Sequence, residues 1–112
     1  IKILNLDEAL PRLREKYGPV YFKEVIPKGT YPGINYEVQT LAVAVVFACH
    51  EKMDEDLAYQ VTKLIIEKRK DLALVHKEAE HITPEHAAVG SPIPYHPGAI
   101  RYYKEKGVTI KQ

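Results

Sequence analysis

The sequence has very little of what several functional classes require. It holds a single cysteine, Cys49, a single serine, Ser91, and no tryptophan. One cysteine cannot form an intrachain disulfide, which argues against a small disulfide-stapled secreted scaffold. The sequence also contains no G-x-S-x-G elbow, no P-loop and no G-x-G-x-x-G. The hydrolases, nucleotide-hydrolysing proteins and dinucleotide-binding proteins that carry these motifs are therefore disfavoured.

A run of charge of one sign is also missing. Acidic and basic residues are interleaved, the formal net charge is +1, and the densest charged stretch, residues 67–71, begins and ends with an acid. Binding to a phosphate backbone needs a clustered basic patch. We therefore expect no nucleic-acid partner.

Long apolar runs are absent as well. The apolar run Leu41–Cys49 is much shorter than the roughly 18 residues that identify a membrane-spanning helix. No signal peptide is visible, and the first residue is Ile1 rather than methionine. We expect a soluble chain whose start has been processed or cut, so that its own N-terminus does not reveal its native compartment.

What remains is the composition of an ordinary globular domain. The 112 residues are 46% hydrophobic and 28% charged, which suits one domain. Valine-rich and aromatic stretches predict strands, and apolar residues at helical spacing between capping residues and glycines predict helices. The last strand lacks strict alternation, which is typical of a strand covered on both faces. We predict strands at 2–6, 20–26 and 36–49, and helices at 7–17, 54–74, 83–90 and 97–106. The first three helices are expected to begin at the capping residues Asp7, Asp54 and Thr83.

The histidines and the cysteine do not predict a metal site. His76, His81 and His86 are spaced by five residues, which does not bring them onto one face of a helix. Surface or capping roles are favoured for them. His96 precedes a helix start, where it could help to bind an anion or simply cap the helix, and capping is favoured. Cys49 lies in an apolar run, which predicts a buried thiol.

The tyrosines are the more informative aromatic residues. Tyr31 and Tyr36 flank a Pro-Gly turn before the long apolar strand, where they either pack the loop or line a ligand pocket. Tyr102 and Tyr103 are expected to anchor the last helix in the core. Arg101, on the same helix, is expected to pair with the acid four residues later.

Several stretches, taken in order, are similar to the C-terminal part of one family of binding proteins. They include I-P-K-G-T-Y-P-G (26–33), V-Q-T-L-A-V (38–43), D-E-D-L-A-Y-Q-V-T-K (54–63), H-I-T-P-E-H-A (81–87) and P-I-P-Y-H-P-G-A-I-R-Y-Y-K-E-K-G (92–107). Together they resemble the TAXI-type solute receptors of TRAP transporters, over nearly the whole chain.

The resemblance implies an α/β fold that is a fragment of a two-lobed, periplasmic-binding-protein-like (type II) fold, with a mixed sheet and C-terminal helices. Residues 1–37 would finish the second lobe, residues 38–49 would form a crossing strand, and residues 50–112 would be the C-terminal helices. The missing N-terminal portion of the same protein, or a second copy of this chain, would be a partner.

The resemblance also implies a function. Such receptors are periplasmic or otherwise extracytoplasmic, close on a small organic anion such as glutamate or a dicarboxylate, and deliver it to the membrane subunits of the transporter. Closure involves no chemistry, so we expect no enzyme activity, no catalytic residue, no cofactor and no metal. Tyr31, Pro32, Gly33 and Thr40 would lie near the cleft, with the two hydroxyls as donors to a carboxylate. The alternative is a self-sufficient small α/β interaction or regulatory module.

Overall fold

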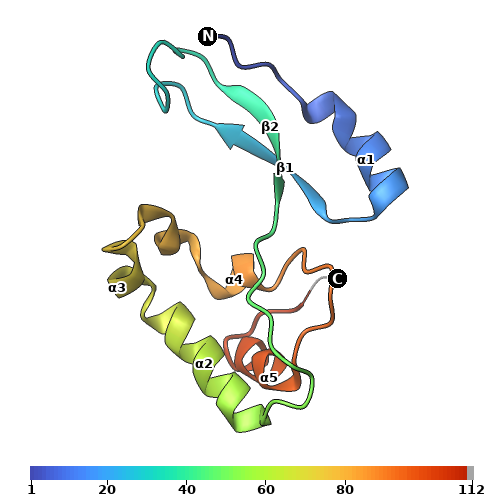
Figure 1. The fold of residues 1–112 in the computed structure, drawn as a ribbon, viewed down its shortest axis with the longest axis vertical. Coiled ribbons are helices and arrows are strands. Elements are labelled where there is room, and N and C mark those ends of the chain that lie inside the picture. Colours follow the sequence, from blue (N-terminus) through green and yellow to red (C-terminus); the bar gives the residue numbers. More distant parts are fainter. Residues whose placement is uncertain (111–112) are drawn as a thin grey trace. The chain divides into compact units, whose positions relative to one another are not determined.

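The computed structural model describes residues 1–110 and confirms the α/β fold class (Figure 1). The chain divides into two compact units, Ile1–Val45 and Val46–Gln112. In the described residues, the sheet consists of two antiparallel strands, both in the first unit. Most of the helical residues belong to the second unit.

The first unit is a β-hairpin with one helix beside it. Strand β1 (Tyr21–Ile26) pairs with β2 (Val38–Val43), from Tyr21 opposite Val43 to Ile26 opposite Val38. The 3-10 turn η1 (Asp7–Ala9) leads into α1 (Leu10–Tyr17), which contacts β1. The helix ends where predicted, at Gly18, whose φ of 80° suits glycine.

The N-terminal segment is not the strand that its alternating apolar residues predict. It makes a backbone contact with β2 in which the Leu6 amide donates to the carbonyl of Gln39 at 2.8 Å. The second hydrogen bond of this contact goes to a side chain instead of the backbone, because the amide of Gln39 donates to Asn5 Oδ1 at 2.9 Å. Asp7, predicted to cap the helix, instead contacts Lys23 Nζ at 3.2 Å, and η1 precedes α1 without a side-chain cap.

Strand β2 is shorter than the valine pattern predicts. It ends at Val43, opposite the first residue of β1, and residues 44–50 have no regular structure. Within residues 1–110 no strand pairs with this stretch, so β-propensity alone does not make it a strand. Cys49 is consequently exposed, and the prediction of a buried thiol is wrong.

Helix α2 (Glu55–Glu67) begins as predicted and ends early. Asp54 caps it, with Oδ1 accepting from the amide of Leu57 at 3.0 Å. The expected single helix to Leu74 is interrupted at Lys68, after the last buried residue, Ile66. Arg69 donates to the freed carbonyl of Ile66 at 3.1 Å, so the break is capped. The helices and turns that follow are α3 (Arg69–Ala73), η2 (Lys77–His81), α4 (Pro84–Ala87) and α5 (Pro97–Glu105).

The core of the second unit lies between α2 and α5. Ile66, Ala88, Tyr102 and Tyr103 form its buried cluster, which confirms the predicted anchoring of the last helix by its two tyrosines. The rings of Tyr102 and Tyr103 meet edge to face, with centroids 6.2 Å apart. The N-terminus of α5 approaches α2 so closely that a residue with a Cβ atom would not fit at position 98, which is occupied by Gly98.

Arg101 does not pair with Glu105 along its own helix, as the sequence predicts. Its guanidinium reaches across to α2, where it contacts Glu55 at 3.1 Å and Asp56 at 2.7 Å. It also lies over the ring of Tyr59, 4.3 Å from the centroid. Two acids at the start of α2 offer the guanidinium fork more partners than one acid on α5. Glu105 instead accepts a hydrogen bond from the Tyr59 hydroxyl at 2.5 Å.

Candidate functional site

Three of the four predicted ligand-binding residues lie in the loop between β1 and β2. Tyr31, Pro32 and Gly33 are exposed, and the Tyr31 side chain is half-exposed at 50%. The loop is nevertheless held by two backbone hydrogen bonds. The amide of Gly29 donates to the carbonyl of Ile34 at 2.8 Å, and the amide of Ile34 donates to the carbonyl of Tyr31 at 3.1 Å. Ile34 itself is buried and anchors the loop.

Tyr36, at the far end of this loop, ties it to the N-terminal segment. Its hydroxyl accepts from the amide of Ile3 at 3.2 Å and donates to the carbonyl of the same residue at 3.2 Å. The hydroxyl of Tyr36 therefore has a structural partner already, and of the two tyrosines Tyr31 is the one whose side chain is more exposed.

Thr40, the fourth predicted residue, lies in the middle of β2, opposite Glu24 of β1. It shares a face of the strand with Val38, because side chains two apart point the same way. Val38 is fully buried and Thr40 half-buried. All four predicted residues thus belong to one hairpin, yet none of them lines either of the two surface depressions described below.

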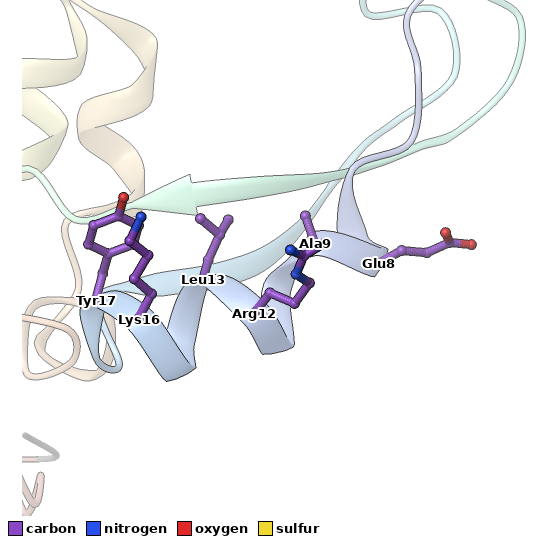
Figure 2. A pocket seen from close by; sticks show the side chains of 6 residues that line it. All are labelled: Glu8, Ala9, Arg12, Leu13, Lys16 and Tyr17. Carbon is purple, nitrogen blue, oxygen red and sulfur yellow. The ribbon is translucent and has the colours of Figure 1, made fainter.

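The first depression lies along α1 and η1 in the same unit. It has a volume of about 520 Å³ (Figure 2). Figure 2 shows the side chains that line it, which are Glu8, Ala9, Arg12, Leu13, Lys16 and Tyr17.

This depression is cationic at its centre. Arg12 and Lys16 are one helical turn apart on α1, on the same side of the helix. Lys16 Nζ lies 5.1 Å from the ring centroid of Tyr17, and that ring packs on Tyr21 at 6.2 Å. In Figure 2 the carboxylate of Glu8 lies at one end and points away from the two cations.

We did not predict this cationic group from the sequence, although the signal was present. Residues 7–17 were expected to be a helix, and Arg12 and Lys16 are spaced by four within it. Such spacing places like charges together, an arrangement that is mildly unfavourable in an isolated helix. The pair could therefore have been singled out before the structure was known.

The second depression lies in the other unit and is largely apolar. It has a volume of about 500 Å³ and a single charged lining residue, Lys104. Tyr95, which lines it, donates to the carbonyl of Ala87 at 3.2 Å, and burial raises the pKa of the Tyr95 hydroxyl. The other lining residues are Pro94, Ile100, Val108, Thr109 and Ile110.

The histidines act as structural groups where the structure defines their contacts. His96 caps α5, with Nδ1 accepting from the amide of Gly98 at 3.2 Å, as the sequence predicts. Its other ring nitrogen donates to the carbonyl of Met53 at 3.1 Å. His76 likewise caps η2 through Nδ1. Among residues 1–110, no group of three or more His, Cys, Asp or Glu side chains could hold a metal ion.

Titratable groups with shifted pKa values cluster in the helical unit and hold its helices together. The hydrogen bond to Glu105 raises the pKa of Tyr59, and the hydrogen bond to Asp56 raises the pKa of Arg101. These groups link α2 to α5 and line neither depression. They stabilise the packing of α2 against α5.

The described helices include none that is both long and apolar enough to cross a membrane. A family model described as the NMT1-like family matches residues 1–107. That family is periplasmic-binding-protein-like, and its members are generally extracytoplasmic solute-binding proteins. Because the match covers almost the entire sequence, the chain belongs to the NMT1-like family.

Proposed function

We propose that this chain is the C-terminal portion of an extracytoplasmic solute receptor of the TAXI type, which serves a TRAP transporter. The observation that supports the proposal is the family match over residues 1–107. The ordered stretches I-P-K-G-T-Y-P-G and H-P-G-A-I-R-Y-Y-K-E-K-G support this type of receptor, because they resemble its C-terminal part. The solute is a small organic anion such as glutamate or a dicarboxylate.

Binding would work by closure of two lobes rather than by chemistry. A solute that contacts the closed arrangement better than the open one shifts the population toward closure. In this assignment residues 1–37 complete the second lobe, and residues 38–49 form the strand that crosses back toward the first lobe. Residues 50–112 are the C-terminal helices. No bond is made or broken, so the protein is not an enzyme and needs no cofactor.

The ligand donors would come partly from the hairpin. Tyr31 is half-exposed in a loop held by internal hydrogen bonds, and such a loop loses little entropy when a ligand binds. Thr40 adds a second hydroxyl from β2, and Pro32 and Gly33 shape the turn. The closed receptor would then be recognised by the membrane subunits of the transporter.

Isothermal titration calorimetry of the purified protein tests this proposal. Glutamate, glutarate and succinate are titrated, with glutamine and butyrate as matched ligands that lack one carboxylate. Saturable binding of the acids with little binding of glutamine supports the proposal. Equal binding of glutamate and glutamine would contradict the anion class. A compact, monomeric chain that binds none of these solutes would favour a self-sufficient interaction module, because a receptor portion without its other lobe is expected to expose apolar surface and to associate.

A further inference from the structure

We infer that the outer edge of β2, centred on Val43, is an interface at which a second copy of this chain adds its own β2 in antiparallel orientation. The inference goes beyond the proposed function, because it concerns the assembly of the chain and not the binding of a solute. Its basis is the pattern of hydrogen bonds along the two edges of the hairpin, together with an apolar sequence that is self-complementary about Val43.

The backbone groups of β2 point alternately toward β1 and away from it. In an antiparallel pair, residues that exchange hydrogen bonds with the neighbouring strand alternate with residues whose amide and carbonyl point outward. Gln39 belongs to the outward set, because its carbonyl accepts from the amide of Leu6 and its amide donates to Asn5 Oδ1. The backbone groups of Leu41 and Val43, two and four residues further along, therefore point outward as well.

The N-terminal segment occupies this outer edge only at Gln39. Among residues 1–110, no hydrogen bond outside the hairpin ladder reaches the backbone of Leu41 or Val43. The side chain of Val43 is 60% exposed, and Val45, the next outward residue if the strand continued, is 98% exposed. The edge is therefore open over residues 41–45, and a row of unpaired amides and carbonyls is a template for another strand.

The outer edge of β1 is protected by comparison. Arg14 Nε donates to the outward carbonyl of Tyr21 at 2.9 Å. The outward amide of Val25 donates to the carboxylate of Glu24 at 3.0 Å. Lys23 lies between these two positions, and charged side chains on an edge strand are a common means of keeping other strands away. A further strand is therefore expected at β2 and not at β1.

The sequence around Val43 identifies the strand that fits this edge as a second copy. A two-fold axis at Val43 places this residue opposite itself and pairs position 41 with 45 and position 42 with 44. Alanine then faces alanine and leucine faces valine, and none of residues 41–45 carries a charge. Apolar cross-strand pairs without opposed like charges stabilise a sheet. A two-fold interface requires this kind of self-complementary surface.

Pairing with a copy also enlarges a sheet that is small by itself. The hairpin has two strands, and within Ile1–Val45 the buried hydrophobic residues are Ile34 and Val38. Three or more strands with an apolar face are generally needed for independent stability. Antiparallel addition of the second β2 joins the two hairpins into one continuous sheet. Its outer edges are then the two β1 strands, which are the protected ones.

The test is an exchange of charge at Val43, read by sedimentation velocity of the whole chain at micromolar concentration. The unmodified chain should sediment as a dimer. Val43→Lys and Val43→Glu each place two like charges opposite one another across the two-fold axis, so each variant alone should be monomeric. An equimolar mixture of the two should recover the dimer, because lysine then faces glutamate. Val25→Lys and Val25→Glu, on the outer edge of β1, are the matched controls and should stay dimeric.

A second variant keeps the test decisive if a charge at position 43 unfolds the hairpin. Val43→Pro removes one outward amide and leaves the hydrogen bonds to β1 intact, a change that edge strands tolerate. It should also be monomeric, with the far-UV circular dichroism of the unmodified chain. Folded Val43→Lys and Val43→Glu variants that stay dimeric alone, or whose mixture stays monomeric, would overturn the pairing at Val43. A monomeric unmodified chain would overturn the second copy as the occupant of this edge.

Discussion

Tyr103 is the residue whose ionisation is most closely tied to folding. Its side chain is 6% exposed, and burial, together with the neighbouring hydroxyls of Tyr95 and Tyr102, raises its pKa to about 12. In the unfolded chain a tyrosine ionises near pH 10. Between these values the unfolded state loses the proton first, so the stability that Tyr103 contributes is complete below pH 10 and declines toward pH 12.

We therefore predict that the unfolding free energy falls by on the order of 2 kcal/mol between pH 9 and pH 12 because of this group. Tyr103→Phe keeps the ring and removes the ionisable group, so it should flatten the decline while leaving stability at pH 7 nearly unchanged. Urea denaturation followed by far-UV circular dichroism at several pH values measures both quantities. An identical decline in the variant would show that other groups cause it.

Single-residue roles that depend on nearby backbone could be predicted from the sequence. Asp54, Thr83 and His96 all cap helices as expected, because a cap bonds an amide two or three residues away. Arg101 and Cys49 were misjudged because their surroundings are set by distant parts of the chain. The partners of Arg101 are at positions 55 and 56, a separation that no local pattern reveals.

The contact between α2 and α5 depends on one glycine. A Cβ atom at Gly98 would clash with the backbone carbonyl of Glu55 and would lie 2.6 Å from the amide nitrogen of Tyr59. Backbone atoms at a helix start cannot move aside cheaply. We predict that Gly98→Ala separates the helices and destabilises the second unit by about 3 kcal/mol, the upper end of the usual cost of overpacking.

Gly107→Ala is the matched control for this substitution. Gly107 has a φ of 72° and open space around it, so the change introduces backbone strain without a clash, at about 1 kcal/mol. Urea denaturation at neutral pH compares the two variants. Equal costs would show that the helices relieve the clash at Gly98 without separating.

At the level of elements, the starts of the helices were more predictable than the ends of helices and strands. Helices α2, α4 and α5 begin after the residues that the sequence marks as caps. By contrast, β2 ends where β1 ceases to pair with it, and α2 ends where its buried stripe stops at Ile66. These ends are set by partners in space, which propensity does not encode.

The candidate site was partly accessible to sequence reasoning. The hairpin residues Tyr31 to Thr40 were identified from turn chemistry and the resemblance, and whether they bind a ligand stays a prediction. The cationic pair Arg12 and Lys16 could have been read from its spacing on a predicted helix. That it shares a depression with Leu13 and Tyr17 required the structure.

For the whole molecule, the division into two units falls within the apolar run. The boundary lies between Val45 and Val46, inside the uncharged stretch from residue 38 to 49. The sequence predicts one continuous strand there, and the structure instead has a short strand followed by exposed residues. Val45 is 98% exposed and Phe47 79% exposed, although valine and phenylalanine normally bury most of their surface.

This exposed apolar stretch should make the isolated chain self-associate. Uncharged segments of high β-propensity with free backbone groups are the usual sites of strand-to-strand association. Val45→Lys/Phe47→Lys places two charges there, and we predict that it lowers the apparent molecular mass at micromolar concentration to that of a monomer. Size-exclusion chromatography with light scattering measures this change. Asn35→Lys, which adds charge at an exposed loop position without removing apolar surface, should leave association as it is. A chain that is already monomeric without these changes would show that residues 44–49 are covered within the molecule in solution. Another segment of the same chain would then pack against them.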